Sequence, residues 1–274
     1  MKIVDEATVP IITLLSDFGL KDPYVAEMKA VILSIHPQAR IVDITHEVEK
    51  FNIRMGAFVL ASATQYFPPS TIHVAVVDPG VGTKRRSIIV ETKRSYYVGP
   101  DNGLLMLAAQ KEGVGHVYHV NNPQYMLPRV SRTFHGRDIF APVAAHLATK
   151  RPSEFGPEIQ DYAFPEFAKP HVRKGELLGE VLHIDDFGNV VSNISEEDLE
   201  KMGICEGCSL RVKLDGKTLT LKFCSAYGEV AAKTPLAIIG SSDFLEISIN
   251  QGTASRTFKA KIGDPIVIQL LLPL

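Results

Sequence analysis

The sequence places a carboxylate, a glycine-rich turn and two arginines within one short segment. Residues 78–86 read Asp-Pro-Gly-Val-Gly-Thr-Lys-Arg-Arg and directly follow the apolar run 72–77. A buried strand ending at Asp78 would fix that carboxylate, the glycines would let the backbone approach a ligand, and Arg85 or Arg86 would supply a permanent positive charge. The combination is typical of a binding or catalytic site, although a hairpin turn with a surface ion pair uses the same residue types.

Other segments share the order of apolar strand, then acid or amide, then glycine. They contain Asp17-Phe18-Gly19, Asp101-Asn102-Gly103 and Asp185-Asp186-Phe187-Gly188-Asn189. A further segment, residues 133–138, sets His135 beside glycine, arginine and aspartate. Ligands of open α/β sheets bind at the carboxyl ends of strands, where such loops gather. The pattern therefore predicts a site built from several of these loops.

Residues 1–170 are expected to form an α/β domain that carries these N-terminal loops. Strands are predicted at 11–16, 40–44 and 72–77, with helices at 24–35 and 53–66. This alternation predicts a largely parallel or mixed sheet with right-handed crossovers. Residues 87–91 and 96–99 resemble a hairpin or edge pair, 139–147 a helix, and the proline-rich stretch 152–170 a linker on the surface.

Residues 171–274 are expected to form a smaller all-β domain. Turn residues separate short strand patterns, a spacing typical of a small barrel or sandwich. The predicted strands are 180–184, 210–214, 218–223, 236–239, 244–249, 256–260 and 265–270. The apolar end, 266–274, is predicted to be a terminal strand packed in a core or a subunit contact.

The composition indicates a globular protein and argues against a nucleic-acid binder. Of its 274 residues, 22% are charged and the formal net charge is -2. No apolar run reaches the roughly 20 residues that a membrane-spanning helix needs. The N-terminus lacks the basic region and cleavage site of a signal peptide, so cytoplasmic location is the default expectation.

The cysteines raise the question of a metal. Cys205-Glu206-Gly207-Cys208 has the spacing of half a zinc site, but only Cys224 remains as a further cysteine. We therefore expect no metal ion, and instead a solvent-facing turn with two thiols that could form a disulfide.

Six motifs occur in the order found in one family. They are Leu15-Ser16-Asp17-Phe18-Gly19, Val77-Asp78-Pro79-Gly80-Val81-Gly82-Thr83, Val98-Gly99-Pro100-Asp101-Asn102-Gly103, Phe134-His135-Gly136-Arg137-Asp138, Asp186-Phe187-Gly188-Asn189 and Asn250-Gln251-Gly252. Over nearly its whole length the chain resembles the S-adenosyl-L-methionine (SAM) hydroxide adenosyltransferases. These enzymes are also called adenosine-forming SAM hydrolases, and they are related to the fluorinating and chlorinating SAM enzymes.

The resemblance implies a fold, an assembly and a reaction. The fold is an α/β N-terminal domain followed by a β-barrel domain, in a trimer whose active sites lie between the N-terminal domain of one subunit and the C-terminal domain of the next. In the reaction, water or hydroxide attacks C5′ of the SAM ribose and releases adenosine and L-methionine without a cofactor. The water-handling triad of the family falls on Asp78, Arg85 and His135, with Arg86 as an adjacent alternative to Arg85.

The chemistry of this triad is consistent with the reaction. Displacement at a sulfonium carbon releases a neutral thioether, so the demand is for a well-aimed nucleophile rather than for an acid. A guanidinium near the water favours hydroxide, His135 could accept the proton, and Asp78 could orient these partners. A carboxylate at Asp78, and Gly136 where the halogenases have a serine near the halide, argue for hydrolysis over halogenation.

Binding roles follow from the same resemblance. Asp17 is expected to accept hydrogen bonds from the ribose hydroxyls, with a helix N-cap or turn as its structural alternative. Asn189 could bind an adenine edge, Phe187 could pack on the ligand, and Asp185 or Asp186 could pair with the methionine ammonium group. Asn250 is a further candidate for the adenine site, with a turn role as its alternative.

Two motif matches fail on context. Asp17-Phe18-Gly19 precedes the His-Gly-Arg-Asp segment and lacks the upstream nucleotide lobe of a protein kinase. Residues 80–84 do not fit the phosphate-binding pattern of nucleotide-binding loops.

A protein that binds SAM or adenosine without turnover remains the serious alternative. Arg85 argues against this alternative, because a binder of a cationic ligand has no use for an added cation.

Overall fold

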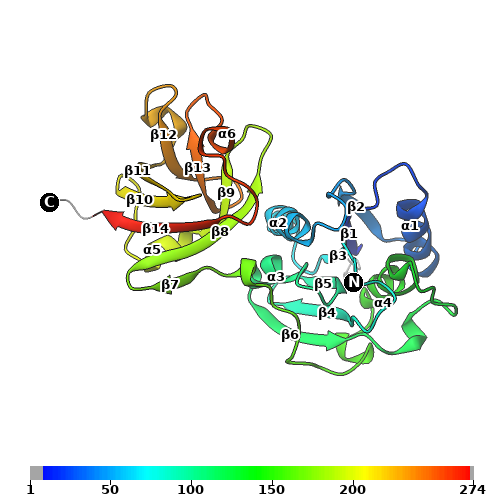
Figure 1. The fold of residues 1–274 in the computed structure, drawn as a ribbon. Helices are drawn as coiled ribbons and strands as arrows, with labels where there is room; N and C mark the ends of the chain where they lie inside the picture. Colours follow the sequence, from blue (N-terminus) through cyan, green and yellow to red (C-terminus); the bar gives the residue numbers. More distant parts are fainter. Residues whose placement is uncertain (1–8, 272–274) are drawn as a thin grey trace, which may run out of the picture. The chain divides into compact units, whose positions relative to one another are not determined.

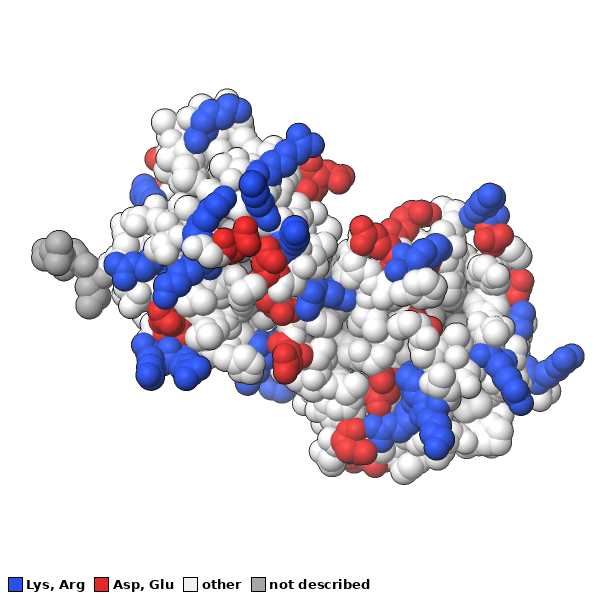
Figure 2. Space-filling model, viewed as in Figure 1, with Lys and Arg blue, Asp and Glu red and all other residues white. Residues whose placement is uncertain are grey.

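The structure is a computed structural model that describes residues 9–271. Its contacts divide the chain into two compact units, Met1–Phe164 and Pro165–Leu274 (Figure 1). Among the described residues, no helix combines the length and the apolarity needed to cross a bilayer. On the face shown in Figure 2, basic and acidic side chains are interspersed.

The first unit is built on a six-stranded mixed sheet with the order β2-β1-β3-β5-β4-β6. Strands β2, β1, β3 and β5 run parallel to one another, whereas β4 is antiparallel to both β5 and β6. The strands are β1 (Ile11–Ser16), β2 (Arg40–Thr45), β3 (Ile72–Val76), β4 (Ser87–Thr92), β5 (Tyr96–Pro100) and β6 (Val114–His119). The predicted hairpin is thus confirmed as the β4–β5 pair.

Helices cover both faces of this sheet. α1 (Tyr24–Ile35) packs against α4 (Ala141–Leu147), and α2 (Ile53–Thr64) packs against α3 (Met106–Glu112). Met28 and Ile32 of α1 share a core with Ile12 and Leu14 of β1. Side chains alternate along a strand, so Thr13 faces the other side of the sheet, where it binds His73.

Several features of the first unit differ from the sequence-based expectation. Helix α4 is preceded by a π-helical turn, Gly136–Phe140, which begins directly after His135. α3 and β6 were not predicted, because α3 is short with its apolar residues in one continuous run and β6 contains few apolar residues. Residues 152–164 follow the surface as expected, but Phe155 is completely buried and anchors the stretch to the core.

The second unit contains a closed β-barrel. Its sheet runs β14-β10-β11-β12-β13-β9-β8-β7, and an additional β14–β8 pairing closes the ring (Figure 1). The strands are β7 (His171–Arg173), β8 (Glu176–Ile184), β9 (Val190–Ser195), β10 (Ser209–Leu214), β11 (Lys217–Cys224), β12 (Pro235–Ile239), β13 (Phe244–Ile249) and β14 (Pro265–Leu271). Ile266 and Ile268 of β14 are fully buried in the core, and residues 272–274 of the predicted apolar end lie outside the described part.

Two short helices interrupt the β pattern of this unit. α5 (Glu196–Lys201) starts at a capping box between Ser195 and Asp198. α6 (Ala254–Phe258) occupies most of the segment 256–260, so the strand predicted there is wrong. Ala254 and Phe258 are one helical turn apart and both enter the barrel core, a spacing that favours the helix.

Candidate active site

A pocket of about 520 Å³ lies where the first-unit strands β1 and β3 end. Asp17 follows directly after β1, and Asp78 lies two residues beyond the end of β3. Parallel strands bring their carboxyl ends to one edge of a sheet, which is why these two loops meet. Asp17, Asp78 and His135 all line this pocket.

Asp78, Arg85 and His135 are in direct contact. The Arg85 guanidinium donates from Nε to Asp78 Oδ1 at 3.1 Å and from Nη2 to Asp78 Oδ2 at 2.5 Å. Nη2 also lies 3.0 Å from Nδ1 of His135. The side chains of Arg85 and Asp78 are only 8% and 5% exposed, so the pair is buried. Arg85 itself is not among the lining residues of the pocket, but it contacts two of them, Asp78 and His135.

The remaining donors of Arg85 are also used. Nη1 donates to the carbonyl oxygen of Arg86 at 2.8 Å and to Oγ of Ser87 at 3.1 Å. A guanidinium has five N–H groups, and these contacts account for all five. Arg85 therefore has no free N–H to offer to a pocket ligand, and only its charge is available to the pocket.

His135 is arranged as a neutral acceptor. Because a guanidinium nitrogen can only donate, Nδ1 of His135 accepts from Arg85 and the ring proton belongs on Nε2. Burial and then the Arg85 charge lower the pKa of His135, against the opposing effects of Asp78 and Asp138. In its uncharged form, the His135 imidazole thus holds the Arg85 guanidinium in place.

Arg86 has a different set of partners. Its Nε donates to Asp101 at 2.9 Å, and its Nη1 donates to Asp161 at 2.9 Å. Asp101 also accepts from the backbone N–H of Ala163 at 2.7 Å. Arg86 therefore ties the segment around residues 161–163 to the end of β5, while Arg85 alone of the two arginines contacts Asp78.

Asp17 is buried at the pocket, where its carboxylate accepts from the backbone N–H of Phe51 at 2.9 Å. It does not cap helix α1, whose N-cap position is Pro23. The backbone carbonyl of Asp17 also accepts from Lys50. These contacts fix the Asp17 loop against the loop that precedes α2.

His46, which the sequence analysis did not select, contacts this loop at Ser16. Its Nδ1 lies 2.7 Å from Oγ of Ser16, the residue before Asp17, and its Nε2 lies 3.2 Å from Asp43. Lys29 binds the same Asp43 carboxylate at 2.6 Å. His46 is 3% exposed and does not line the pocket, so its role is to position its neighbours.

Aromatic side chains form one wall of this pocket. The rings of Phe18, Tyr24 and Phe134 contact one another with centroids 5.1 to 5.7 Å apart. Arg137 lies over Phe134 and bridges Glu27 to the buried Asp138, whose carboxylate also accepts from the N–H of Ser131. This network holds the segment that presents His135, and a π-helical turn at such a point is common in functional sites.

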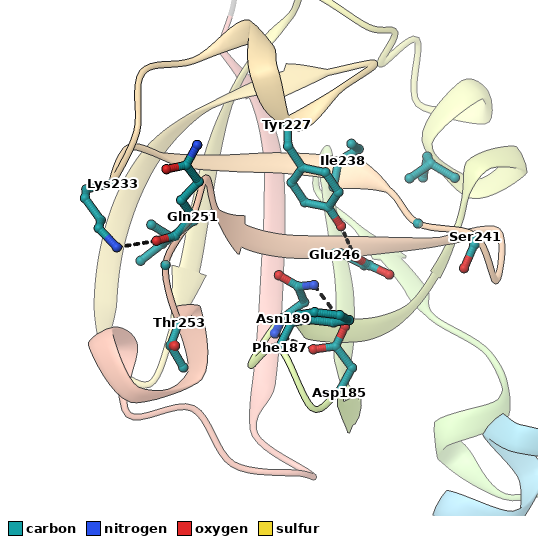
Figure 3. Close-up of a pocket in the computed structure, with 14 residues that line it drawn as sticks. Asp185, Phe187, Asn189, Tyr227, Lys233, Ile238, Ser241, Glu246, Gln251 and Thr253 are labelled. Carbon is teal, nitrogen blue, oxygen red and sulfur yellow. Dashed lines mark hydrogen bonds between the residues drawn. The ribbon is translucent and has the colours of Figure 1, made fainter.

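Three of the five predicted C-terminal residues line a second pocket, of about 810 Å³, in the barrel unit (Figure 3). Asp185, Phe187 and Asn189 line it. The backbone N–H and side-chain amide of Asn189 donate to the two oxygens of Asp185 at 2.8 and 2.9 Å. Phe187 is 81% exposed at the rim of the pocket. The Asp-Asp-Phe-Gly-Asn turn therefore presents an acid, an amide and a ring together.

Two candidates from the sequence do not line this pocket. Asp186 is exposed beside Asp185 and lies outside the lining. Asn250 donates its side-chain amide to the carbonyl of Val230 at 2.8 Å and so supports a neighbouring turn. Of the two aspartates, Asp185 is thus the one that lines the pocket.

Glu246 and Tyr227 are pocket residues that the sequence analysis missed. Tyr227 donates to Oε2 of Glu246 at 3.1 Å (Figure 3). Burial raises the pKa of the Glu246 carboxyl and the nearby Asp185 charge adds to the rise, while the Tyr227 hydrogen bond opposes it. A lone acid within the apolar run 244–249 was the available signal for Glu246, whereas Tyr227 lies in a short 3₁₀ turn without any pattern.

Among residues 9–271, no three His, Cys, Asp or Glu side chains converge as metal ligands would. Cys205 and Cys208 are free thiols with their sulfur atoms 3.4 Å apart. Cys205 is exposed, as the predicted turn required.

Both units match known protein domains. The SAM hydroxide adenosyltransferase N-terminal domain matches residues 12–156, and the corresponding C-terminal domain matches residues 179–267. A Methanocaldococcus jannaschii protein named (R)-S-adenosyl-L-methionine hydrolase is 38% identical over 266 residues, which cover 94% of this chain and 95% of the relative. A Salinispora tropica protein of the same name is also 38% identical, over 262 residues that cover 94% and 97% of the two chains.

More distant relatives and a solved structure agree with this. A fluorinase from Actinoplanes sp. is 30% identical over 289 residues, covering 94% of this chain and 97% of the relative. The crystal structure of an uncharacterized conserved protein from Thermotoga maritima has a TM-score of 0.83 at 42% identity, covering 94% of this chain and 99% of that one. With both domains matched and relatives similar over nearly their full length, the chain belongs to the SAM hydroxide adenosyltransferase family.

Proposed function

We propose that the protein hydrolyses SAM to adenosine and L-methionine through attack of water or hydroxide on C5′ of the ribose. The observation that carries this proposal is the contact of Asp78, Arg85 and His135 in the wall of the pocket that Asp17 also lines. Relatives named (R)-S-adenosyl-L-methionine hydrolase support it.

The chemistry asks for a nucleophile and not for an acid. Breaking the bond from C5′ to the sulfonium releases methionine as a neutral thioether, so the leaving group needs no proton. The attacking oxygen has to lose a proton as it bonds to carbon. A buried positive charge near that oxygen lowers the energy of its hydroxide form.

Arg85 supplies this charge from behind the pocket wall. All five of its N–H groups are engaged, so the water contacts Asp78 and His135 instead. Nδ1 of His135 is occupied by Arg85, which makes the imidazole the group that orients the guanidinium. The Asp78 carboxylate keeps lone pairs free and is the proton acceptor in this arrangement. This assignment exchanges the roles first expected for Asp78 and His135.

The binding roles divide between the two pockets. Asp17 accepts hydrogen bonds from the ribose hydroxyls, and Asn189 binds an adenine edge with Phe187 packed on the ligand. Asp185 pairs with the methionine ammonium group. Asn250 supports the adenine site through the turn that it braces at Val230. No step of this reaction requires a cofactor.

A trimer accounts for the division of these residues. Each unit carries only part of the set, with Asp17 and Asp78 at one pocket and Asp185 and Asn189 at another. We place the complete site where the first unit of one subunit meets the barrel unit of the next. Burial at such a boundary would exclude bulk water and strengthen the attraction between the sulfonium and the nucleophile.

Hydrolysis is favoured over halogenation by the pocket wall. The Asp78 carboxylate faces the position of the nucleophile and would repel fluoride or chloride. A water molecule can instead donate a hydrogen bond to that carboxylate.

Incubation with SAM in ¹⁸O-labelled water tests the proposal. Chromatography with mass spectrometry should find the label in the 5′-hydroxyl of adenosine and unlabelled methionine. The two sulfonium epimers are assayed separately because the relatives are named for the (R) form, and parallel samples contain fluoride or chloride. SAM that stays intact and bound would identify a binding protein, and a 5′-halogenated nucleoside would identify a halogenase.

A further inference from the structure

We propose that Glu246, held by Tyr227, is a specificity-determining residue that binds the methionine ammonium group of the substrate together with Asp185. The inference rests on the proposed function and extends it to a residue that carries no assigned role. It predicts that the barrel pocket selects substrates that bear an α-ammonium group.

The backbone directs Glu246 into the pocket. On β13, Leu245 and Ile247 enter the barrel core, so the alternation of side chains turns Glu246 to the opposite face. The residue is 8% exposed and lines the pocket. A side chain on Gly240 would place its Cβ 1.8 Å from Oε1 of Glu246, so glycine is needed to leave room for this carboxylate.

The hydrogen bonds of Glu246 leave one oxygen available. Tyr227 donates to Oε2, and within residues 9–271 no donor is assigned to Oε1. Figure 3 shows Glu246 with Tyr227 on one side and Asp185 with Asn189 on the other. Both acids line the same pocket, so a cation bound there would lie near two carboxylates.

The charges at this point favour a cation. Among the described residues that line the pocket, Lys233 is the basic one, and its ammonium donates to the carbonyl of Gln251 instead. Burial raises the pKa of the Glu246 carboxyl, and the nearby Asp185 charge adds a smaller rise because the two carboxylates repel each other. An ammonium group, with three N–H donors and a positive charge, would satisfy both acids and remove this repulsion.

Glu246→Gln tests the inference because it keeps the shape and the Tyr227 contact but removes the charge. Calorimetry of the full-length protein would compare L-methionine, adenosine and 4-(methylthio)butanoate, which is methionine without its amino group. We expect methionine binding to weaken by ~10–100-fold, the range for a hydrogen bond to a charged group. Binding of adenosine and of the amine-free analogue should change by less than about threefold. Glu200→Gln, an exposed glutamate on α5, is the matched control.

Kinetics give an independent readout. In Glu246→Gln the KM for SAM should rise with kcat nearly unchanged, since the ammonium group is remote from C5′. Should that variant fail to fold, Tyr227→Phe removes the supporting hydrogen bond and should weaken methionine several-fold while sparing adenosine. Unchanged methionine binding, or equal losses for methionine and its amine-free analogue, would overturn the inference. Because the calorimetry needs no turnover, it separates this outcome from a failure of the proposed hydrolysis.

Discussion

Arg85 binds Asp78 through two parallel hydrogen bonds, from Nε to Oδ1 and from Nη2 to Oδ2, in a site where both side chains are buried. A planar guanidinium matches a carboxylate in this way, and an ammonium does not. The pair fixes the orientation of the carboxylate that faces the pocket. The charge of Arg85 and the position of Asp78 are therefore one structural unit, and each depends on the other.

Arg85→Lys should lose catalysis while it keeps the charge. A lysine cannot make the paired contact with Asp78 and also reach His135, so the carboxylate loses its orientation. We expect kcat to fall by ~100-fold or more, with the SAM dissociation constant changed only several-fold. Rapid-quench assays and calorimetry measure the two quantities.

Arg86→Ala is the matched control for this variant. Arg86 binds Asp101 and Asp161, and no contact of it with Asp78 is found in the described part of the chain. Its loss should therefore lower the melting temperature while kcat stays close to the wild-type value. Equal catalytic losses in the two variants would show that the distinction between the arginines is mistaken.

Asp78→Asn should remove the proposed proton acceptor and leave Arg85 with a weaker partner. Activity should fall by at least ~100-fold, because an amide oxygen cannot take the proton from water. Removing one partner of a buried ion pair costs about 3–5 kcal/mol, and the retained amide oxygen should keep the loss near the lower end of that range. Urea unfolding measures the stability, and single-turnover assays measure the chemical step. Full activity in this variant would transfer the acceptor role to His135.

His73 should make the stability of the protein fall as the medium becomes acidic. It is fully buried between Thr13 and Tyr97, and burial lowers its pKa from 6.5 to about 3, with a smaller contribution from Arg94. Below pH 6.5 the unfolded chain binds a proton at His73 that the folded protein does not bind. The contribution of the neutral ring to the free energy of unfolding is therefore complete above that pH. It is lost progressively as pH falls toward 3, with a slope approaching ~1.4 kcal/mol per pH unit.

Urea unfolding of wild type and His73→Gln between pH 7.5 and 4.5 checks this expectation. The variant is less stable at neutral pH but lacks the titrating ring, so its stability should depend less on pH by about one proton. Parallel pH dependences for the two proteins would assign the acid sensitivity to other groups.

The sequence predicted most strands of the first unit because each is a short apolar run that ends in turn residues. β1 and β3 begin at the predicted residues, and their ends place Asp17 and Asp78 at the same pocket. The choice between Arg85 and Arg86 needed the structure, since adjacent side chains on an extended segment point to opposite sides. The strand predicted at 256–260 is wrong because the burial of Ala254 and Phe258 outweighs local strand propensity. Tyr227 and Glu246 are 19 residues apart in the sequence but hydrogen-bonded in the fold, and no local sequence pattern predicts such a contact.

Two inactive variants should restore activity when they are assembled together. Arg85→Ala removes the proposed catalytic charge from the first unit, and Asn189→Ala removes the proposed adenine contact from the barrel unit. If each site uses the first unit of one subunit and the barrel unit of the next, random mixed trimers contain intact sites. With equal amounts of both variants, about a quarter of all sites should be intact, because each half is wild type in half of the subunits.

Co-expression with two different affinity tags, followed by tandem purification, isolates the mixed assemblies for a SAM turnover assay. Reassembled wild-type subunits with the same two tags give the reference activity, and each variant assembled alone gives the background. A mixture that stays at the background would mean that each active site is built from a single chain, and the proposed sharing between subunits would have to be abandoned. Every mixed trimer has one intact site out of three, so recovery near about a third of the reference after the purification requires that a site draw its two halves from different chains, since no single chain in the mixture carries both wild-type residues.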